Sequence, residues 1–184
     1  ANDKITVSTD LWIISRLHEV IELSTKNLKN FEYAIAMEII EEFFWKDFCD
    51  NYLEIVKVRS YNENGLDNEG QTSAILTLYW VLRTLLQLFA PILPHITEEL
   101  FHAIYGAENS IHSKQMWPDY TIVPYNEELI KHGNYMLEAI ELVRKAKAER
   151  NLSIKAPLGK VNIDSPLALK EDMIQDIMNA IAAG

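Results

Sequence analysis

The sequence has very little cysteine, glycine or proline for its length. Cys49 is the one cysteine among 184 residues, which excludes a disulfide framework and a cysteine-based zinc site and leads us to expect a reducing compartment. Six glycines and six prolines are too few for the many turns of a β-sandwich or barrel. With 48% hydrophobic and 10% aromatic residues, the chain can bury a sizeable core, which excludes a disordered tail.

The sequence also lacks the short motifs of common catalytic sites. It contains no glycine-rich phosphate loop, no Gly-x-Ser-x-Gly elbow and no His-Glu-x-x-His zinc helix. His95, Glu98 and His102 share one expected helix at spacings of three and four residues. A metal-binding bundle needs carboxylates and histidines on several facing helices, and the sequence shows no second helix of this kind. We therefore expect neither a metal site nor catalytic residues in this chain.

Apolar residues recur with helical spacing along most of the chain, which predicts a mainly α fold. Ser8, Thr9 and Asp10 are expected to supply N-cap oxygens for the first helix, and Asn126 for the last long one. Pro94 suits the first turn of a helix. The expected helices span residues 8–30, 32–59, 72–90, 94–106 and 126–150. We predict an antiparallel bundle of about five helices.

The most apolar stretch, residues 72–90, has two interpretations. A membrane span needs about 20 mostly apolar residues. Arg83 and Gln87 interrupt this stretch, and Pro91 ends it. We therefore expect a buried central helix and no contact with a membrane.

The last part of the chain changes character after residue 150. Apolar and polar residues alternate over 151–164 around Pro157 and Gly159, which predicts a strand pair or an extended arm. A helical pattern resumes over 167–182. We therefore divide the chain into a helical bundle (1–150) and the beginning of a small mixed α/β subdomain (151–184).

The net charge of −10 argues against general affinity for nucleic acid, but the charge is uneven. Residues 144–160 hold six cations and one acid, a local charge of +5, and the second expected helix mixes cations with aromatic residues. Cations can hold RNA phosphates and aromatic rings can stack on unpaired bases, whereas a solvated face and core positions are the alternative interpretations. The cationic candidates for RNA contact are Lys46, Lys57, Arg59, Arg144, Lys145, Lys147, Arg150 and Lys155.

Five segments, in chain order, resemble the anticodon-binding domain of class I aminoacyl-tRNA synthetases. They are 10–17 (DLWIISRL), 45–57 (WKDFCDNYLEIVK), 88–101 (LFAPILPHITEELF), 110–118 (SIH…WP) and 143–158 (VRKAKAERNLSIKAPL). Segment 45–57 is similar to the valyl members of this class and differs from the isoleucyl relatives. Asn51 departs from the valyl pattern, because those members commonly carry Trp at this position.

The resemblance implies a fragment of a larger ligase. The catalytic domain of this family carries a His-Ile-Gly-His-like and a Lys-Met-Ser-Lys-Ser-like motif, and this sequence contains neither. The fragment is thus expected to be non-catalytic and to need no cofactor, whereas its parent uses ATP and Mg. Its implied partners are the anticodon stem-loop of valine tRNA and the rest of the synthetase chain, in the cytoplasm, and a monomer is expected.

Three alternatives remain open at this point. The chain could be the same domain of an isoleucyl- or leucyl-tRNA synthetase. It could also be a helical protein-interaction module whose acidic surface binds a basic partner. A metalloenzyme bundle is the third alternative, and it would need ligands on a second helix.

Overall fold

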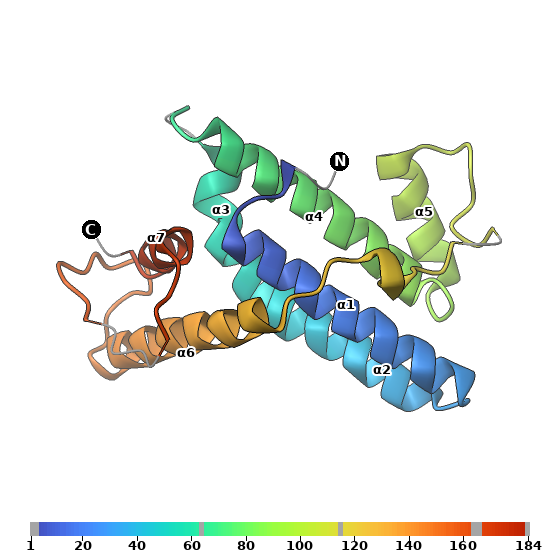
Figure 1. The fold of residues 1–184 in the computed structure, drawn as a ribbon, viewed down its shortest axis with the longest axis horizontal. Coiled ribbons are helices and arrows are strands. Elements are labelled where there is room, and N and C mark those ends of the chain that lie inside the picture. The colour runs from blue at the N-terminus through green and yellow to red at the C-terminus, as the bar shows by residue number, and fades with distance from the viewer. Residues whose placement is uncertain (1–3, 63–64, 114–115, 163–166, 183–184) are drawn as a thin grey trace.

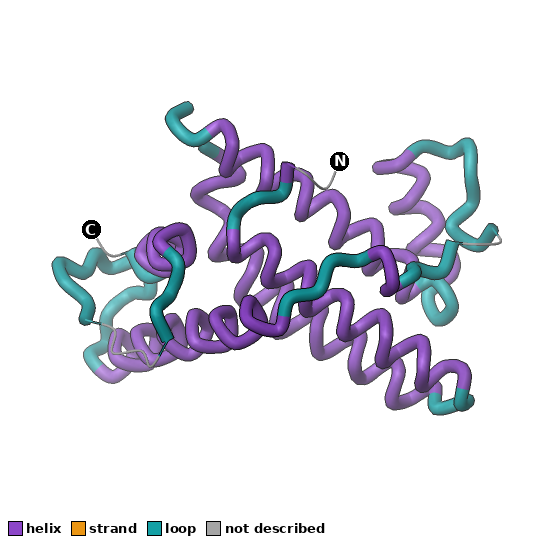
Figure 2. Tube along the Cα trace, viewed as in Figure 1, coloured by secondary structure: helices purple, strands orange, loops and turns teal. Residues whose placement is uncertain are grey.

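The fold consists of helices and connecting loops, as Figure 1 and Figure 2 show. The structure is a computed structural model that describes residues 4–62, 65–113, 116–162 and 167–182, and no strand occurs in these ranges. The elements are α1 (Ser8–Lys29), α2 (Tyr33–Glu42), the π-helix η2 (Phe43–Tyr52), α3 (Leu53–Tyr61), α4 (Asn68–Phe89), α5 (Pro94–Tyr105), the 3-10 helix η3 (Tyr120–Ile122), α6 (Glu127–Glu149) and α7 (Glu171–Ala180). The predicted helical bundle is confirmed.

Helix α1 lies at the centre of the bundle and packs against α2, α4, α6 and α7. Its apolar residues follow the predicted helical period, and Trp12, Ile13, Leu17 and Ile21 are all fully buried. The expectation for its N-terminus was wrong. Val7 occupies the N-cap position without a side-chain cap, and the three residues that follow it are buried within the helix.

The second expected helix is continuous, but its middle third is a π-helix. In η2 the backbone bonds span five residues instead of four, so that the Leu53 N–H bonds to the Phe48 carbonyl. This wider turn places Phe43, Phe48 and Tyr52 in the core. A pattern with a period of 3.6 residues could not predict this change of register.

Helix α4 contains the apolar stretch singled out in the sequence, and α5 packs against it. By length and composition alone α4 could cross a membrane. In this structure one face of α4 packs against α1, α2 and α3, with Ala74, Val81 and Leu85 buried. Ile75 and Tyr79 on α4 are about half exposed, so α4 is not the buried central helix that the sequence predicted. Pro94 begins α5 and Gly106 caps its C-terminus, as predicted.

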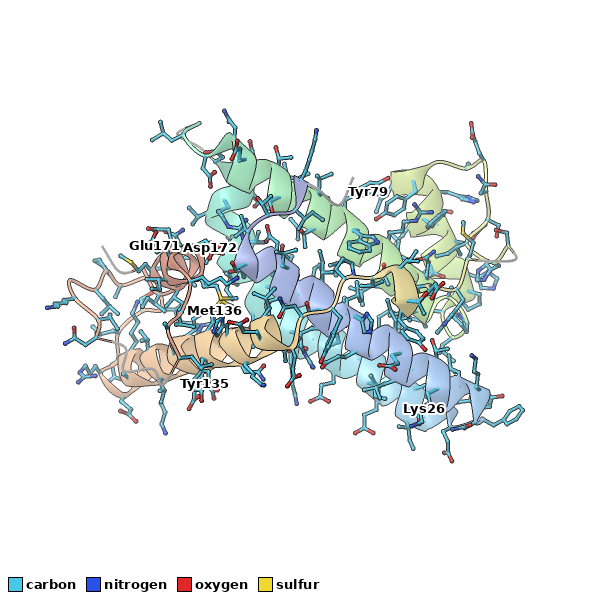
Figure 3. All side chains as sticks on the ribbon, in the orientation of Figure 1. Lys26, Tyr79, Tyr135, Met136, Glu171 and Asp172 are labelled. Carbon is cyan, nitrogen blue, oxygen red and sulfur yellow. The ribbon has the colours of Figure 1, made fainter. Side chains whose placement is uncertain are left out.

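The C-terminal segment does not contain the expected strand pair among its described residues, which end at 162 before resuming at 167. Residues 151–162 form short turns and irregular backbone, with an isolated bridge at Leu158, whose amide donates to the carbonyl of Ala182 (2.9 Å). Helix α7 packs on α1, α3 and α6, where Met173 and Ile177 join the main core. Its Asp172, labelled in Figure 3, accepts a hydrogen bond from the Ser8 amide (2.7 Å). The domain boundary at residue 150 stays a prediction.

Candidate nucleic-acid interface

Three exposed cations of the candidate set lie at the C-terminal end of α6 and in the segment after it. Lys145, Arg150 and Lys155 are all exposed. Arg150 donates to the carbonyl of Ala146 one turn earlier (3.2 Å), which holds its guanidinium against the helix. None of these three side chains forms a salt bridge with another described residue. All three are therefore available to contact RNA phosphates.

A hydrogen bond joins this end of α6 to the surface of η2. The half-buried Arg144 donates to Asn51 Oδ1 (3.3 Å), and Asn51 Nδ2 in turn donates to the carbonyl of Lys46 (2.8 Å). Two predicted groups of cations, nearly a hundred residues apart in the chain, are therefore neighbours in space. Asn51, the position that departs from the valyl pattern, makes the connection between them.

Lys46 and Lys57 are exposed and each is paired with an acid on its own helix. Lys46 Nζ lies 2.7 Å from Glu42, and Lys57 Nζ lies 3.7 Å from Glu54. The hydrogen bond and charge of Glu42 raise the pKa of Lys46. Exposed pairs of this kind contribute little free energy, so an RNA phosphate can replace the carboxylate at small cost.

Among the aromatic residues of η2, Trp45 is the one that lies on the surface. Phe43 and Tyr52 are fully buried and Phe44 is half-buried, whereas 59% of Trp45 is exposed. Its neighbour in the sequence is Lys46. An exposed indole beside a cation is suited to stacking on an unpaired base. The sequence showed the aromatic cluster but not which ring would face solvent.

Arg59 is a correction to the predicted set, because its side chain is occupied inside the protein. It is 8% exposed and lies between two buried carboxylates. Its guanidinium donates to Asp10 (3.0 and 2.8 Å), to Asp176 (2.9 and 3.0 Å) and to the carbonyl of Gly70 (3.2 Å), which uses all five of its N–H groups. Although burial opposes the charged form, the bonds to Asp10 and Asp176 raise the pKa of Arg59 well above its ordinary value. Arg59 therefore joins α3 to α1 and α7 and has no donor left for RNA.

Lys147 is the second correction. Only 3% of it is exposed, and its ammonium donates to the carbonyls of Ile154, Ala156 and Ile181 at 2.7 Å each. These bonds use all three of its N–H groups. Burial lowers the pKa of Lys147. The side chain holds the turns after α6 against the end of α7, and it is not available to a ligand.

A shallow hollow of about 380 Å³ lies beside the exposed cations of α6. Its walls include the apolar side chains of Leu142, Leu152 and Val161, and the cations Arg150 and Lys160 stand at it as well. A surface that combines apolar and cationic groups can contact a sugar or base and its phosphate together. The hollow thus extends the cationic surface from α6 onto the segment that follows.

The acidic and histidine residues do not form a metal site in the part of the chain that the structure describes. No group of three such side chains is arranged to hold a metal there. Of the trio considered in the sequence, Glu98 and His102 contact each other at 3.0 Å. His102 and Glu98 are thus an i,i+4 pair on the surface of α5.

Comparison with known proteins identifies the family. Residues 10–163 match the anticodon-binding domain of tRNA ligase, and the chain belongs to this family. It is 49% identical over 181 residues to the valine–tRNA ligase of Rickettsia rickettsii (strain Sheila Smith), a match that covers 98% of this chain and 22% of that ligase. The valine–tRNA ligases of Rickettsia prowazekii (strain Madrid E) and Rickettsia felis are each 45% identical over 98% of this chain, which covers 22% and 21% of their lengths.

These relatives confirm the resemblance seen in the sequence. All three are valine–tRNA ligases, so neither the isoleucyl or leucyl alternative nor the protein-interaction module is favoured. The chain spans about a fifth of the length of the ligases it matches.

Proposed function

We propose that this chain binds the anticodon stem-loop of valine tRNA as one domain of a valine–tRNA ligase. The observation that carries the proposal is the 49% identity to such a ligase over 98% of the chain. By holding the anticodon end, the domain positions the tRNA for ATP-dependent aminoacylation at a catalytic domain outside this chain. ATP and Mg act in that catalytic domain, and the chain alone is non-catalytic.

The binding surface that we propose joins the end of α6 to the surface of η2. Lys145, Arg150 and Lys155 supply exposed cations, and Arg144 links them to Asn51 on η2. These cations hold the phosphates of the stem, which fixes its position without reading its sequence. Unpaired bases of the loop stack on exposed aromatic surface such as Trp45.

The remaining properties of the parent follow from the same assignment. The ligase acts in the cytoplasm, and this domain works as part of one monomeric polypeptide. Its overall negative charge suits this role, because a net charge of −10 repels RNA except at the cationic surface. The affinity for RNA is therefore restricted to the cationic surface, where bound tRNA is positioned for aminoacylation.

The test is binding of the chain to a labelled valine anticodon stem-loop at two salt concentrations, with isoleucine and leucine stem-loops as competitors. The informative variant is Lys145→Ala combined with Arg150→Ala. The matched control is Lys131→Ala, which removes an exposed cation from the other end of α6, where it pairs with Glu127 (2.8 Å). Circular dichroism checks that all three proteins are folded.

The proposal predicts that the valine stem-loop binds best and that the double variant weakens binding by about tenfold. It also predicts that the slope of log Kd against log salt falls by about 2 in the double variant, since two phosphate contacts are lost. The Lys131→Ala control should bind the stem-loop with the same affinity as the unsubstituted chain. An equal loss of affinity in the control and in the double variant would show that the RNA does not bind specifically at the end of α6. If the folded chain bound no stem-loop, this would contradict recognition of the anticodon by the isolated domain.

A further inference from the structure

Helix α5 presents an aliphatic stripe to solvent. Its first turn and the residues just before it contain Ile92, Leu93 and Ile96, and the next two turns contain Leu100 and Ile104. Each of these five side chains is between 41% and 53% exposed. The helical pattern puts Ile96, Leu100, Phe101 and Ile104 on the apolar side of this helix, and of these four residues Phe101 alone is buried.

The geometry of the helix shows how the stripe arises. At 100° per residue, Leu93, Ile96, Leu100 and Ile104 fall within one sector of about 80°. The neighbouring sector holds Thr97 and Phe101, which are buried against α4. The third sector is polar and contains His95, Glu98, Glu99 and His102. The stripe itself holds no charged residue, so α5 has two apolar faces and the described structure covers one of them.

The attachment of α5 to the bundle is small. Its covered face joins a cluster of four buried residues, separate from the main core: Leu86, Ala90, Phe101 and Ile111. At its C-terminal end, Tyr105 Oη donates to the carbonyl of Tyr79 on α4 (2.7 Å), and Tyr79 is seen beside α5 in Figure 3. Arg83 lies over the rings of Phe101 and Tyr105, 5.8 Å from each centroid. A helix held by so few buried residues gains much from burying its second apolar face.

We propose that this stripe docks permanently against an apolar surface in another part of the same ligase polypeptide. The inference rests on that part of the proposed function that places the chain inside a full-length ligase, and it does not depend on tRNA binding. More than three quarters of the related ligase lies outside the region that this chain matches, so ample polypeptide exists to cover α5.

The chemistry of the stripe favours such an internal partner. A contiguous aliphatic patch without charges resembles the core of an obligate interface, whereas RNA-binding surfaces are rich in cations. The cationic candidates for RNA contact lie on η2, α3, α6 and the segment after α6, and α5 itself carries no lysine or arginine. Docking would therefore fix the orientation of the anticodon domain within the ligase while leaving its RNA surface free.

The experiment measures cysteine labelling at single positions by mass spectrometry of the corresponding peptide, without RNA. Leu100→Cys and Ile96→Cys are made both in the 184-residue chain and in the full-length ligase, and each rate is divided by the rate in the denatured protein. His95→Cys, on the polar side of the same helix, is the matched control. We expect both stripe positions to be labelled at least tenfold more slowly in the full-length ligase than in the chain, while the control changes less than threefold.

Two results would overturn the proposal. Equal labelling of the stripe in the ligase and in the chain would show that the face stays open. Slow labelling in the chain that becomes faster on dilution would show that a second copy of the chain covers the stripe instead. Neither result would affect the stem-loop binding experiment, so failure of this inference is distinguishable from failure of the proposed function.

Discussion

Arg59 on α3 donates two hydrogen bonds to Asp10 on α1, at 3.0 and 2.8 Å, across 49 residues of sequence. Asp10 also accepts from Tyr52 Oη (2.7 Å) and from Ser73 Oγ (2.6 Å). With Asp176 on the other side of Arg59, the network joins α1, η2, α3, α4 and α7 around buried charges. Since every charge in it has an opposite partner, the network fixes how these elements meet.

Replacing Arg59 with Met should strongly destabilise the fold, because Asp10 and Asp176 would then stay buried without a cation. Removing one partner of a buried ion pair costs about 3–5 kcal/mol. Urea unfolding followed by circular dichroism measures the change. The control is Lys57→Met on the same helix, where an exposed pair is lost and a change within about 0.5 kcal/mol is expected. Similar losses in both variants would contradict the structural role of Arg59.

The same network predicts a loss of stability at alkaline pH. Tyr52 is fully buried, and burial together with the nearby Asp10 carboxylate raises its pKa well above 10. In the unfolded chain a tyrosine loses its proton near pH 10. The contribution of Tyr52 to stability is therefore complete below pH 10 and is lost as the pH rises through its folded pKa. The expected slope is up to about 1.4 kcal/mol per pH unit.

Tyr52→Phe separates this effect from other alkaline titrations. The variant should be less stable at pH 8 by about 1 kcal/mol, since one hydrogen bond to Asp10 is lost. The gap between the two proteins should then narrow between pH 10 and 11, as measured by urea unfolding at each pH. Parallel stability curves across this range would show that Tyr52 does not titrate as expected.

Gly133 should not tolerate even a methyl group, because α6 crosses α1 against an indole ring at this point. A Cβ atom at Gly133 would lie within 3.0 Å of ring atoms of Trp12, which is fully buried and has no room to move. Gly133→Ala should thus destabilise the chain by about 2–3 kcal/mol, despite the better helix propensity of Ala. Thermal unfolding of Gly133→Ala beside Asn134→Ala, at an exposed neighbouring position, measures this. An unchanged midpoint in Gly133→Ala would contradict the close crossing.

The sequence predicted those parts of the fold that depend on local patterns. Apolar periodicity located the long helices, and the start of α5 at Pro94 and the cap of α6 at Asn126 followed from the chemistry of single residues. The π-helix was missed because its spacing depends on packing against α1, which is a tertiary effect. For the same reason the helical pattern of α5 does not show that Phe101 is buried while Ile96 and Leu100 are exposed.

The candidate site was predictable as a group of cations but not residue by residue. Arg59 and Lys147 look like their exposed neighbours in the sequence, yet each is buried by contacts with segments far along the chain. Arg59 is held by Asp176 in α7, and Lys147 is held by the carbonyl of Ile181 just after α7. Local sequence patterns do not show how this helix packs. The link between Arg144 and Asn51 is equally non-local.

Lys145 and Lys147 lie two residues apart on α6, yet substitution by Met should affect RNA binding at Lys145 and the stability of the fold at Lys147. Lys147→Met removes three hydrogen bonds to backbone carbonyls and should destabilise the chain by about 3 kcal/mol, with faster amide exchange over residues 151–162. Lys145→Met removes an exposed cation, so it should leave stability within about 0.5 kcal/mol and weaken stem-loop binding two- to fivefold with a smaller salt slope. Hydrogen exchange, urea unfolding and stem-loop titration of both variants measure these differences. If Lys147→Met left the stability unchanged and its folded protein bound RNA more weakly, Lys147 would be an RNA contact and not a structural residue.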